Sequence, residues 1–485
     1  MSFIPTDLDI KLSFPFITVI AFALVLFMFG PAFDNRKSTA PARISILGAL
    51  TAAAFSISLW NSGQFAFNGA LIVDNYSLLS HLILIVSFCA AAAHSSRSAL
   101  PPSFHAWLTV ALAGLMLVAS AGNLLVLIAG AETASAAILL AARSSARALP
   151  QPQKLPRAGA PLSAAASALM IAGSLIVHYV TGETGIYEIK FYLMLSAAAP
   201  DAMETAGAFT NHGASPALGG SFLMTGFAFF ALGFIYKMSP VARALFVRKD
   251  FEKLPGSLAG FMSGAAKTAG AVAAFRALHI AMPAIEESWR AVLSAAIVAS
   301  AGFSIAAAAA AGGKRRRALA CMGAAHTGLA LSSALIDGPT GNAVMFLYLA
   351  AHAIGTAGAF AIPAEGAAKN QTRALAAVAV FFSLAALPPA AGHAAASKLT
   401  HFINGNIGHF IVAALTAMAL IYIRILFIYI YGSREMGKNA PGVGAEAGAG
   451  SASVATACAI AVAALGMLQI EAVALFITAA LYFGG

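Results

Sequence analysis

Four ionisable side chains interrupt long apolar stretches of the sequence. Glu132 lies in LIAGAETASAAIL, Lys237 in ALGFIYKMSP, Lys267 in MSGAAKTAGAV and Lys398 in PPAAGHAAASKL. A charged side chain at the middle of a membrane costs about 3 kcal/mol or more, so such a residue is a functional candidate by default. Carboxyl and amino groups that bind and release protons would make these four residues candidates for proton transfer.

Each candidate also has a simpler interpretation. Glu132 and Lys267 lie deep in their apolar runs. There the alternative to a proton-transfer role is a purely structural one, in which the buried polar group makes a hydrogen bond. Lys237 lies near the end of its run, where a lysine can extend to the headgroups. Pro240 follows it and can break the helix, which would leave carbonyls free to bind water or ions. Lys398 similarly follows Pro388, Pro389 and Gly392.

Two histidines, His326 and His352, also fall inside apolar runs. A buried histidine is usually a hydrogen-bonded core residue, but its ordinary pKa near 6.5 suits it to proton relay where water is present. Arg276 and Arg424 are interpreted as structural residues that are paired or reach the headgroups.

The composition predicts the elements that hold these residues. Of the 485 residues, 60% are hydrophobic and only 9% are charged, whereas soluble domains carry about 25% charged residues. Apolar runs of about 20 residues are long enough to cross a bilayer, and backbone groups in lipid must be satisfied internally, which favours helices. The runs do not alternate as barrel strands would. The fold class is therefore predicted to be an all-α, polytopic membrane protein.

The apolar windows and their breaks predict about fourteen membrane-spanning helices. These windows are 14–31, 44–60, 76–95, 104–121, 123–142, 162–181, 219–241, 256–279, 288–311, 317–336, 343–363, 373–396, 405–431 and 452–470. The Gly- and Ala-rich segment 437–454 is predicted to be a flexible loop.

The formal net charge of +10 has a topological explanation. Most Lys and Arg residues follow the odd-numbered windows, whereas the loop after the sixth window carries Glu183, Glu188, Asp201 and Glu204. The positive-inside rule then places both termini outside, in the periplasm or intermembrane space. This distribution argues against nucleic-acid binding.

No metal or nucleotide motif is evident. Cys89, Cys321 and Cys458 are far apart and form no C-x-x-C pair, which argues against a zinc or iron–sulfur site. The string SGAAKT lacks the glycine that precedes lysine in a phosphate-binding loop.

The order of these residues resembles the antiporter-like proton-channel subunits of respiratory complex I (NADH:quinone oxidoreductase), and most closely subunit N, called subunit 2 in mitochondria. Glu132 falls where that family has its helix-5 glutamate, and Lys237 and Lys267 reproduce the spacing of its helix-7 and helix-8 lysines. RRALACMGAAHTG is similar to its helix 10, which places His326, and FFSLAALPPAAG to the start of its broken helix 12. The resemblance covers about residues 74–431.

Some positions depart from the family pattern. Lys398 falls two residues later than the family's helix-12 lysine, and His352 stands where the family often has tyrosine. A lysine rather than a glutamate in helix 12 argues against the M-type subunit. No long lateral helix is evident after the last window, which argues against the L-type.

The resemblance implies two inverted five-helix repeats with broken helices 7 and 12. It divides the chain into three N-terminal helices (1–103), a first repeat (104–280), a second repeat (281–431), and a loop with a C-terminal helix (432–485). It also implies a bacterial cytoplasmic or mitochondrial inner membrane location, with other complex I membrane subunits as partners. The chain itself would hold no cofactor, and FMN, iron–sulfur clusters and quinone would belong to partner subunits.

The implied function is proton translocation coupled to quinone reduction elsewhere, with Glu132, Lys237, Lys267, His326 and Lys398 carrying the protons. Proximity of Glu132 would favour the charged form of Lys237, and separation would release the proton toward Lys267. His326 would then relay it toward Lys398. Subunits of multisubunit Na⁺/H⁺ antiporters and of membrane-bound hydrogenases share this pattern, and such a subunit is the alternative. A second alternative, from another class, is a non-transporting membrane scaffold.

Overall fold

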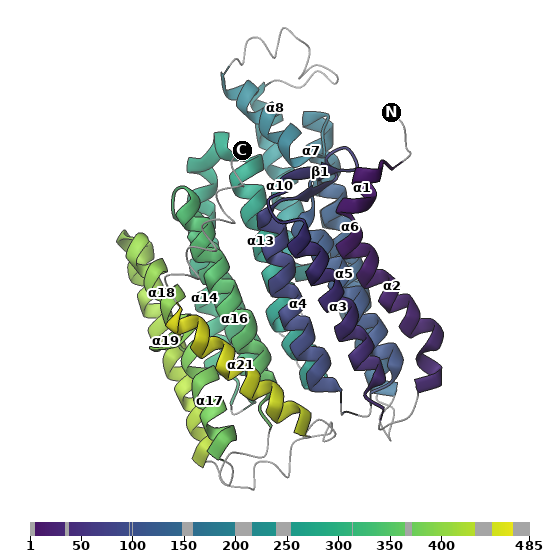
Figure 1. Ribbon diagram of the computed structural model, residues 1–485. Coiled ribbons are helices and arrows are strands. Elements are labelled where there is room, and N and C mark those ends of the chain that lie inside the picture. The colour runs from purple at the N-terminus through teal and green to yellow at the C-terminus, as the bar shows by residue number, and fades with distance from the viewer. Residues whose placement is uncertain are drawn as a thin grey trace.

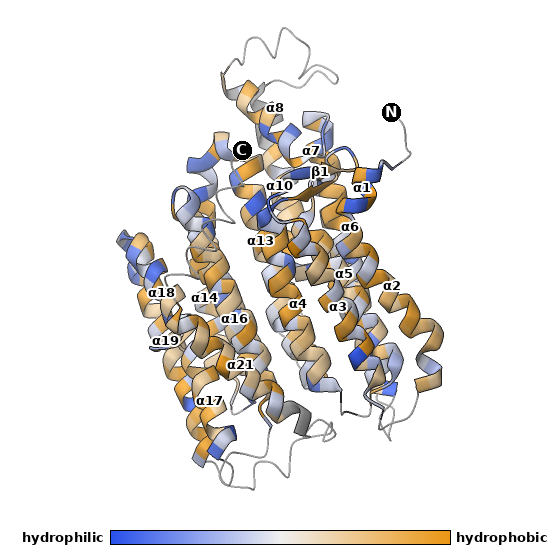
Figure 2. Cartoon of the chain, viewed as in Figure 1, coloured by the Kyte–Doolittle hydropathy of each residue, from blue (hydrophilic) through white to orange (hydrophobic). Residues whose placement is uncertain are grey.

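The computed structural model describes residues 5–33, 38–96, 98, 100–147, 159–198, 216–238, 254–312, 314–363, 371–431 and 449–468. Long helices lie side by side in a bundle, as predicted, and a small two-stranded hairpin lies at one end of it (Figure 1). Hydrophobic residues cover the helices along much of their length, and hydrophilic residues gather toward their ends (Figure 2).

The N-terminal part of the bundle leads from the first helices through the hairpin to the helices that carry Glu132 and Lys237. Its elements are α1 (Asp7–Leu12), α2 (Phe14–Phe29), α3 (Ala40–Ser58), β1 (Gln64–Ala66), β2 (Leu71–Val73), α4 (Asn75–Ser95), α5 (Pro102–Ser120), α6 (Leu124–Arg147), α7 (Gly159–Thr181), α8 (Ile186–Ala198) and α10 (Pro216–Met238).

The C-terminal part begins with a helix that contains two π-helical segments. Its elements are α12 (Gly256–Phe261), the π-helix η4 (Met262–Ala266), α13 (Lys267–Arg276), the π-helix η5 (Ala277–Ala281), α14 (Glu286–Ala309), α15 (Arg315–Leu331), α16 (Pro339–Ala361), α17 (Gln371–Leu384), α18 (Ala391–Phe402), α19 (Gly405–Tyr431) and α21 (Ala449–Met467).

A helix lies on each of the fourteen predicted windows. Within the described ranges, ten helices are long and apolar enough to cross a membrane, and three more are apolar but shorter: Phe222–Met238, Gln371–Leu384 and Ala452–Met467. The predicted multi-pass helical membrane fold is therefore confirmed. The number fourteen stays a prediction, as does the inverted symmetry of the two repeats.

Burial separates the central helices from the peripheral ones. The apolar window of α16 is 89% buried, whereas that of the helix from Pro283 to Ala309 is only 22% buried. Large apolar side chains such as Met28 and Phe303 are exposed on the peripheral helices. An aqueous surface would disfavour this much exposed apolar area, and a lipid environment accommodates it.

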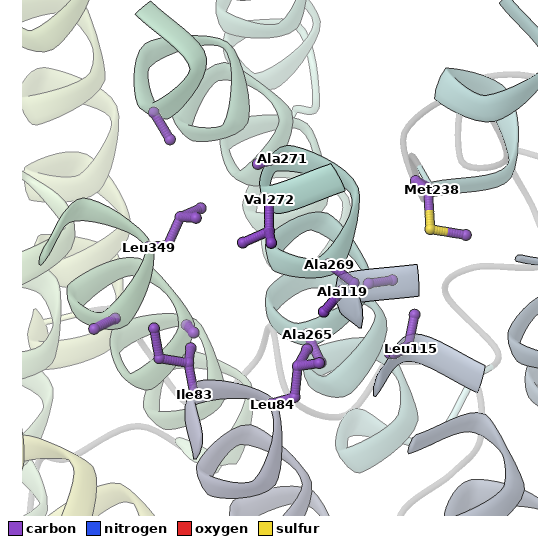
Figure 3. Packing of buried hydrophobic residues seen from close by; sticks show 14 of the residues in the cluster. Ile83, Leu84, Leu115, Ala119, Met238, Ala265, Ala269, Ala271, Val272 and Leu349 are labelled. Atoms are coloured by element: carbon purple, nitrogen blue, oxygen red, sulfur yellow. The ribbon is translucent and has the colours of Figure 1, made fainter. Parts of the chain in front are cut away.

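The segment α12–α13 lies at the centre of the bundle. Ala265, Ala269 and Val272 face α4, α5 and α16, which contribute Leu84, Leu115 and Leu349 (Figure 3). Small residues on the central helix allow its neighbours to approach closely, which is the usual means of packing helices inside a membrane. The segment that carries Lys267 is thereby held on several sides.

The predicted break of helix 12 is present. Helix α17 ends at Leu384 and α18 begins at Ala391, with the two prolines between them. Proline lacks a backbone N–H and cannot continue a helix, which explains the interruption. The corresponding break after Lys237 stays a prediction, because Pro240 lies outside the described residues.

Two regions differ from the sequence-based expectation. The segment after the sixth window was expected to be a loop, but Ile186–Ala198 forms the helix α8, which is too short to be recognised as a span. The prediction of a loop over 437–454 is wrong at its C-terminal end, because the helix α21 begins at Ala449. The small residues there include alanines, which are good helix formers. Residues 437–448 lie outside the described residues.

A buried ion pair joins the N-terminal helices to the central segment. An Nη of Arg276 at the end of α13 donates to Oδ1 of Asp74 at 2.8 Å, and Asp74 also caps α4 by accepting from the Ser77 amide. The guanidinium lies 5.0 Å from the ring centroid of Tyr76. The interpretation of Arg276 as a paired structural residue is therefore confirmed.

Asp9 links α1 to the hairpin by a hydrogen bond. Its Oδ1 accepts from the Phe67 amide at 2.6 Å, and its Oδ2 accepts from both the amide and the hydroxyl of Thr6. Phe67 has a φ of 52°, a conformation that a bulky residue rarely adopts. The hydrogen bond from Asp9 helps to hold this turn.

These hydrogen bonds predict a pH dependence of the hairpin. The bonds from Phe67 and then Thr6 lower the pKa of Asp9 below its ordinary value of 3.8. A lowered folded-state pKa means that the contribution of Asp9 is complete above the ordinary value and is lost as the pH falls through the lowered one. We expect Asp9→Ala to accelerate the hydrogen exchange of the backbone amides of residues 64–73 at neutral pH. In the unmodified protein, acidification below about pH 4 should accelerate the same exchange, once it is corrected for the intrinsic exchange rates. Asp7→Ala is the control, and unchanged exchange in Asp9→Ala would contradict this role.

Candidate functional site

Glu132 and Lys237 form an ion pair between α6 and α10. Lys237 Nζ lies 2.8 Å from Glu132 Oε2, and the lysine side chain is 2% exposed. The same ammonium donates to Ser163 Oγ at 3.1 Å, and Ser135 Oγ lies at 3.5 Å. An ammonium has three N–H donors, so these oxygens account for all of them. The structure thus brings together the first two predicted residues.

Close helix packing places this pair. Gly130, two residues before Glu132, lies so near α5 that a Cβ there would be 2.9 Å from the carbonyl oxygen of Gly114. Gly233, one turn before Lys237, has no room for a side chain because the Ala166 carbonyl of α7 occupies that space. Glycine is used in membrane helices for such approaches. The two contacts bring α6, α7 and α10 close enough for their polar groups to meet.

Only one of the two carboxylate oxygens of Glu132 has a hydrogen-bond partner among the described residues. Its side chain is 38% exposed as a whole, yet its Oε1 is buried and has no hydrogen-bond partner in the described part of the chain. A buried unpartnered carboxylate oxygen is costly. It therefore offers an acceptor for a water molecule or a proton on the side of the carboxylate away from Lys237.

Lys267 is fully enclosed and lacks a carboxylate. Its Nζ donates to the Ala320 carbonyl of α15 at 3.1 Å, and no ion pair to it is present among the described residues. It directly follows the π-helix η4, and π-helical segments within α-helices occur frequently at functional sites. Burying an ammonium group without a counter-ion is costly.

The two lysines lie on helices that contact each other. Met238, next to Lys237, packs on α13, where a Cβ at Gly270 would be 2.7 Å from the Met238 Cβ. Gly270 is about one turn from Lys267. No hydrogen bond joins the two lysines within the described ranges, so a proton passing between them requires intervening water or side-chain movement.

His326 is held between two tyrosines. Its Nδ1 lies 2.9 Å from Tyr348 Oη and its Nε2 lies 3.1 Å from Tyr422 Oη. A neutral imidazole has one donor and one acceptor nitrogen, and a tyrosine hydroxyl can play either part. A proton can therefore enter at one nitrogen while another leaves from the other, with the ring held in place.

A second histidine extends this cluster toward the broken helix. The His352 ring lies 4.6 Å from that of His326, and its Nδ1 is 3.2 Å from Thr356 Oγ1. His352 Nε2 is buried and has no partner among the described residues. Both histidines line a small cavity of about 10 Å³, together with Ser383 and Gly392. About that volume is needed to hold one water.

Lys398 is not part of this cluster. It is exposed on α18, because the buried face of that helix consists of Ala391, Ala394, Ala395, Ala396 and Leu399. The ionisable group at the break itself is His393, whose Nδ1 lies 3.1 Å from the Ala386 carbonyl. The role of Lys398 in proton transfer stays a prediction.

Several residues of the site had no individual signal in the sequence. Tyr422 is 96 residues from His326, and Ser163 is 74 residues from Lys237. A hydroxyl group is far less costly than a charge inside a membrane helix, so its presence in an apolar run does not mark it as functional. His393 did have a signal, since it directly follows Gly392 in the broken segment.

No described group of three or more His, Cys, Asp or Glu side chains could hold a metal ion. The three cysteines are free thiols. The placement of redox cofactors in partner subunits remains a prediction.

No family model matches the sequence. A curated relative, the NADH-quinone oxidoreductase subunit N of Rhodobacter capsulatus, is 25% identical over 455 residues, which is 89% of this chain and 90% of the relative. Further relatives with the same subunit name are similar over most of their length. Over most of its length the chain is therefore similar in sequence to proteins named subunit N.

Solved structures share the fold of this chain. A chain of respiratory complex I from Thermus thermophilus superposes with a TM-score of 0.68 at 18% identity, over 95% of this chain and 98% of that one. A chain of the Mrp complex from Dietzia sp. DQ12-45-1b gives a TM-score of 0.74 at 15% identity, over 97% of both chains. At these identities the structural likeness establishes the fold, and the sequence relatives supply the link to subunit N.

Proposed function

We propose that this chain is the N-type, proton-translocating membrane subunit of an NADH:quinone oxidoreductase, with other membrane subunits of that complex as its partners. The names of its relatives support the complex, since both chains are covered almost completely. The observation that carries the proton function is the Glu132–Lys237 pair, in which a charge is held inside apolar helices at 2.8 Å from its counter-ion.

The first step of the proposed path is control of Lys237 by Glu132. While the two groups are in contact, the carboxylate favours the charged lysine. If a conformational change in the complex separates them, the lysine loses this stabilisation and can release its proton toward Lys267 on the adjoining helix.

The second step runs from Lys267 to the histidine cluster. The Lys267 ammonium lies against Gly323 of α15, three residues before His326 on the same helix. His326 can take up and pass on a proton between Tyr348 and Tyr422 without turning its ring. From there the path continues through the small cavity at the helix-12 break, and Lys398 discharges the proton from its exposed position on α18.

The proposed orientation places both termini outside, because the basic residues follow the odd-numbered spans. In this orientation the hairpin, α1 and the Asp74–Arg276 pair lie toward the outside. We also propose the division into three N-terminal helices, repeats at 104–280 and 281–431, and a C-terminal segment from 432. The close contact of α7 with α10 inside the first repeat is consistent with this division.

Electron transfer would take place in partner subunits that hold FMN, iron–sulfur clusters and quinone. This chain would contribute no redox step, and its residues would bind, hold and move protons. A bacterial cytoplasmic membrane or a mitochondrial inner membrane would supply the bilayer in which such a complex works.

A subunit of a multisubunit Na⁺/H⁺ antiporter or a membrane-bound hydrogenase is the second candidate. The likeness to a chain of the Mrp complex, with a TM-score of 0.74, is the observation that favours it. All these assemblies can use the same buried lysines, so the site alone does not separate them.

Purification of the native complex through a tag on this chain separates the two candidates. We expect subunits with FMN and iron–sulfur clusters to co-purify, together with NADH-driven quinone reduction and proton uptake in vesicles. A purified complex that lacks all redox cofactors and exchanges Na⁺ for protons would overturn the proposal in favour of the antiporter. A complex with redox centres but no proton movement would favour a structural membrane scaffold.

A further inference from the structure

Gly323 lies where the Lys267 ammonium meets α15. Ala320, Gly323 and His326 follow one another at intervals of three residues and share one helical face. A Cβ at position 323 would overlap Lys267 Nζ, and the next nearest atoms are Lys267 Cε at 3.5 Å and the Ser263 carbonyl oxygen at 3.6 Å. The volume of the missing side chain is therefore occupied by this one ammonium group.

Backbone conformation does not explain this glycine. Gly323 is not among the glycines with positive φ, so its backbone is one that any residue adopts. Glycine is disfavoured inside a helix relative to alanine, and Gly323 lies well inside α15, which runs from Arg315 to Leu331. A requirement for space at the lysine is the reason that remains.

We infer that Gly323 is a positioning residue for Lys267. By lacking a side chain, it lets the ammonium lie against α15, where the amine donates to the Ala320 carbonyl at 3.1 Å and faces the turn that carries His326. The inference deepens the proposed function and rests on it, because it concerns the transfer of a proton from Lys267 toward the histidine cluster.

An alanine at position 323 would force the ammonium away from this place. The lysine chain is flexible, so the ammonium can move without unfolding α15, but the bond to Ala320 would be lost. A displacement on the order of 1 Å at a reacting group can reduce a rate by about 100-fold. We therefore expect Gly323→Ala to assemble and to reduce proton translocation per assembled complex by about 10- to 100-fold.

Gly302 provides the matched control. It lies in α14, and nothing lies within 4 Å of the place where its Cβ would be. In the complete native complex in vesicles, Gly302→Ala should translocate protons at the unmodified rate. Gly323→Ala should be slower and show a larger solvent deuterium isotope effect on turnover, because the misplaced proton transfer becomes rate-limiting. A loss of assembled complex alone would not change that isotope effect, so a slower variant with an unmodified isotope effect would contradict the inference.

A double-mutant cycle with Lys267→Ala tests the contact independently of pumping. Gly323→Ala should lower the melting temperature of the complex when Lys267 is present and should not lower it in the Lys267→Ala background, since the overlapping group is then absent. An equal decrease in both backgrounds would overturn the inference. So would full pumping by Gly323→Ala when Lys267→Ala abolishes pumping. Full pumping by Lys267→Ala would instead contradict the proposed function, while the melting temperatures would still decide the contact.

Discussion

Replacement of Lys237 by alanine should reduce proton translocation by about 100-fold or more, the range expected when a proton-transferring side chain is removed. The variant should still assemble, because Glu132 is 38% exposed and can bind water once its partner is gone. The measurement is proton uptake into vesicles per quinone reduced, normalised to the amount of assembled complex. Lys11, an exposed lysine on α1, provides the control, and Lys11→Ala should leave proton uptake unchanged.

Arginine at position 237 separates charge from proton transfer. Lys237→Arg keeps a positive charge beside Glu132, but a guanidinium does not release its proton in proteins. We expect this variant to be as stable as the unmodified complex and yet as inactive in pumping as Lys237→Ala. Full pumping by Lys237→Arg would show that the lysine provides only a fixed charge, and would remove it from the proposed path.

A glutamine at position 132 tests the other member of the pair. Glu132→Gln retains the shape and an acceptor oxygen but removes the charge that favours the charged lysine. If the two residues act as one gate, the double variant with Lys237→Ala should be no slower than Lys237→Ala alone. Effects that simply multiply would indicate two independent sites, and the proposed gating step would then be wrong.

The sequence was sufficient to find the buried charges because each one is costly where it stands. Glu132, Lys237 and Lys267 could be recognised from the sequence, because each is a charged residue within a long apolar window. Their contacts could not be read in the same way. Lys237 is 105 residues from Glu132, and only helix packing through residues such as Gly130 and Gly233 brings them together.

The direction in which the Lys398 side chain points could not be predicted from its apolar window. The rotation of the helix that restarts after a break decides which residues face inward, and the sequence window does not give that rotation. In α18 the small residues from Ala391 to Ala396 take the buried face, and Lys398 points away from it. The π-helical segments around α13 were equally hidden, since a π-turn requires no distinctive composition.

Loss of Asp74 should strongly destabilise the protein. The Asp74–Arg276 pair is almost completely buried, with side-chain exposures of 7% and 1%. Removing one partner of a buried ion pair leaves an uncompensated charge, at a cost of about 3–5 kcal/mol. Asp74→Ala also removes the carboxylate that caps α4. We expect little assembled complex, and a melting temperature well below that of the unmodified complex for whatever assembles.

The reason lies in what this pair connects. Asp74 begins α4 of the N-terminal helices, and Arg276 ends the segment that carries Lys267 and immediately precedes the π-helix η5. In Asp74→Asn the charge of Arg276 is left unpaired, and this unpaired charge is expected to cause most of the lost stability. Arg276→Met in the Asp74→Asn background removes both charges and should therefore recover much of that stability. Thermal unfolding of the four members of this cycle measures the coupling. If the double variant is no more stable than Asp74→Asn, the pair does not stabilise the junction through its charges, and the packing of Tyr76 against the guanidinium is the stronger contribution.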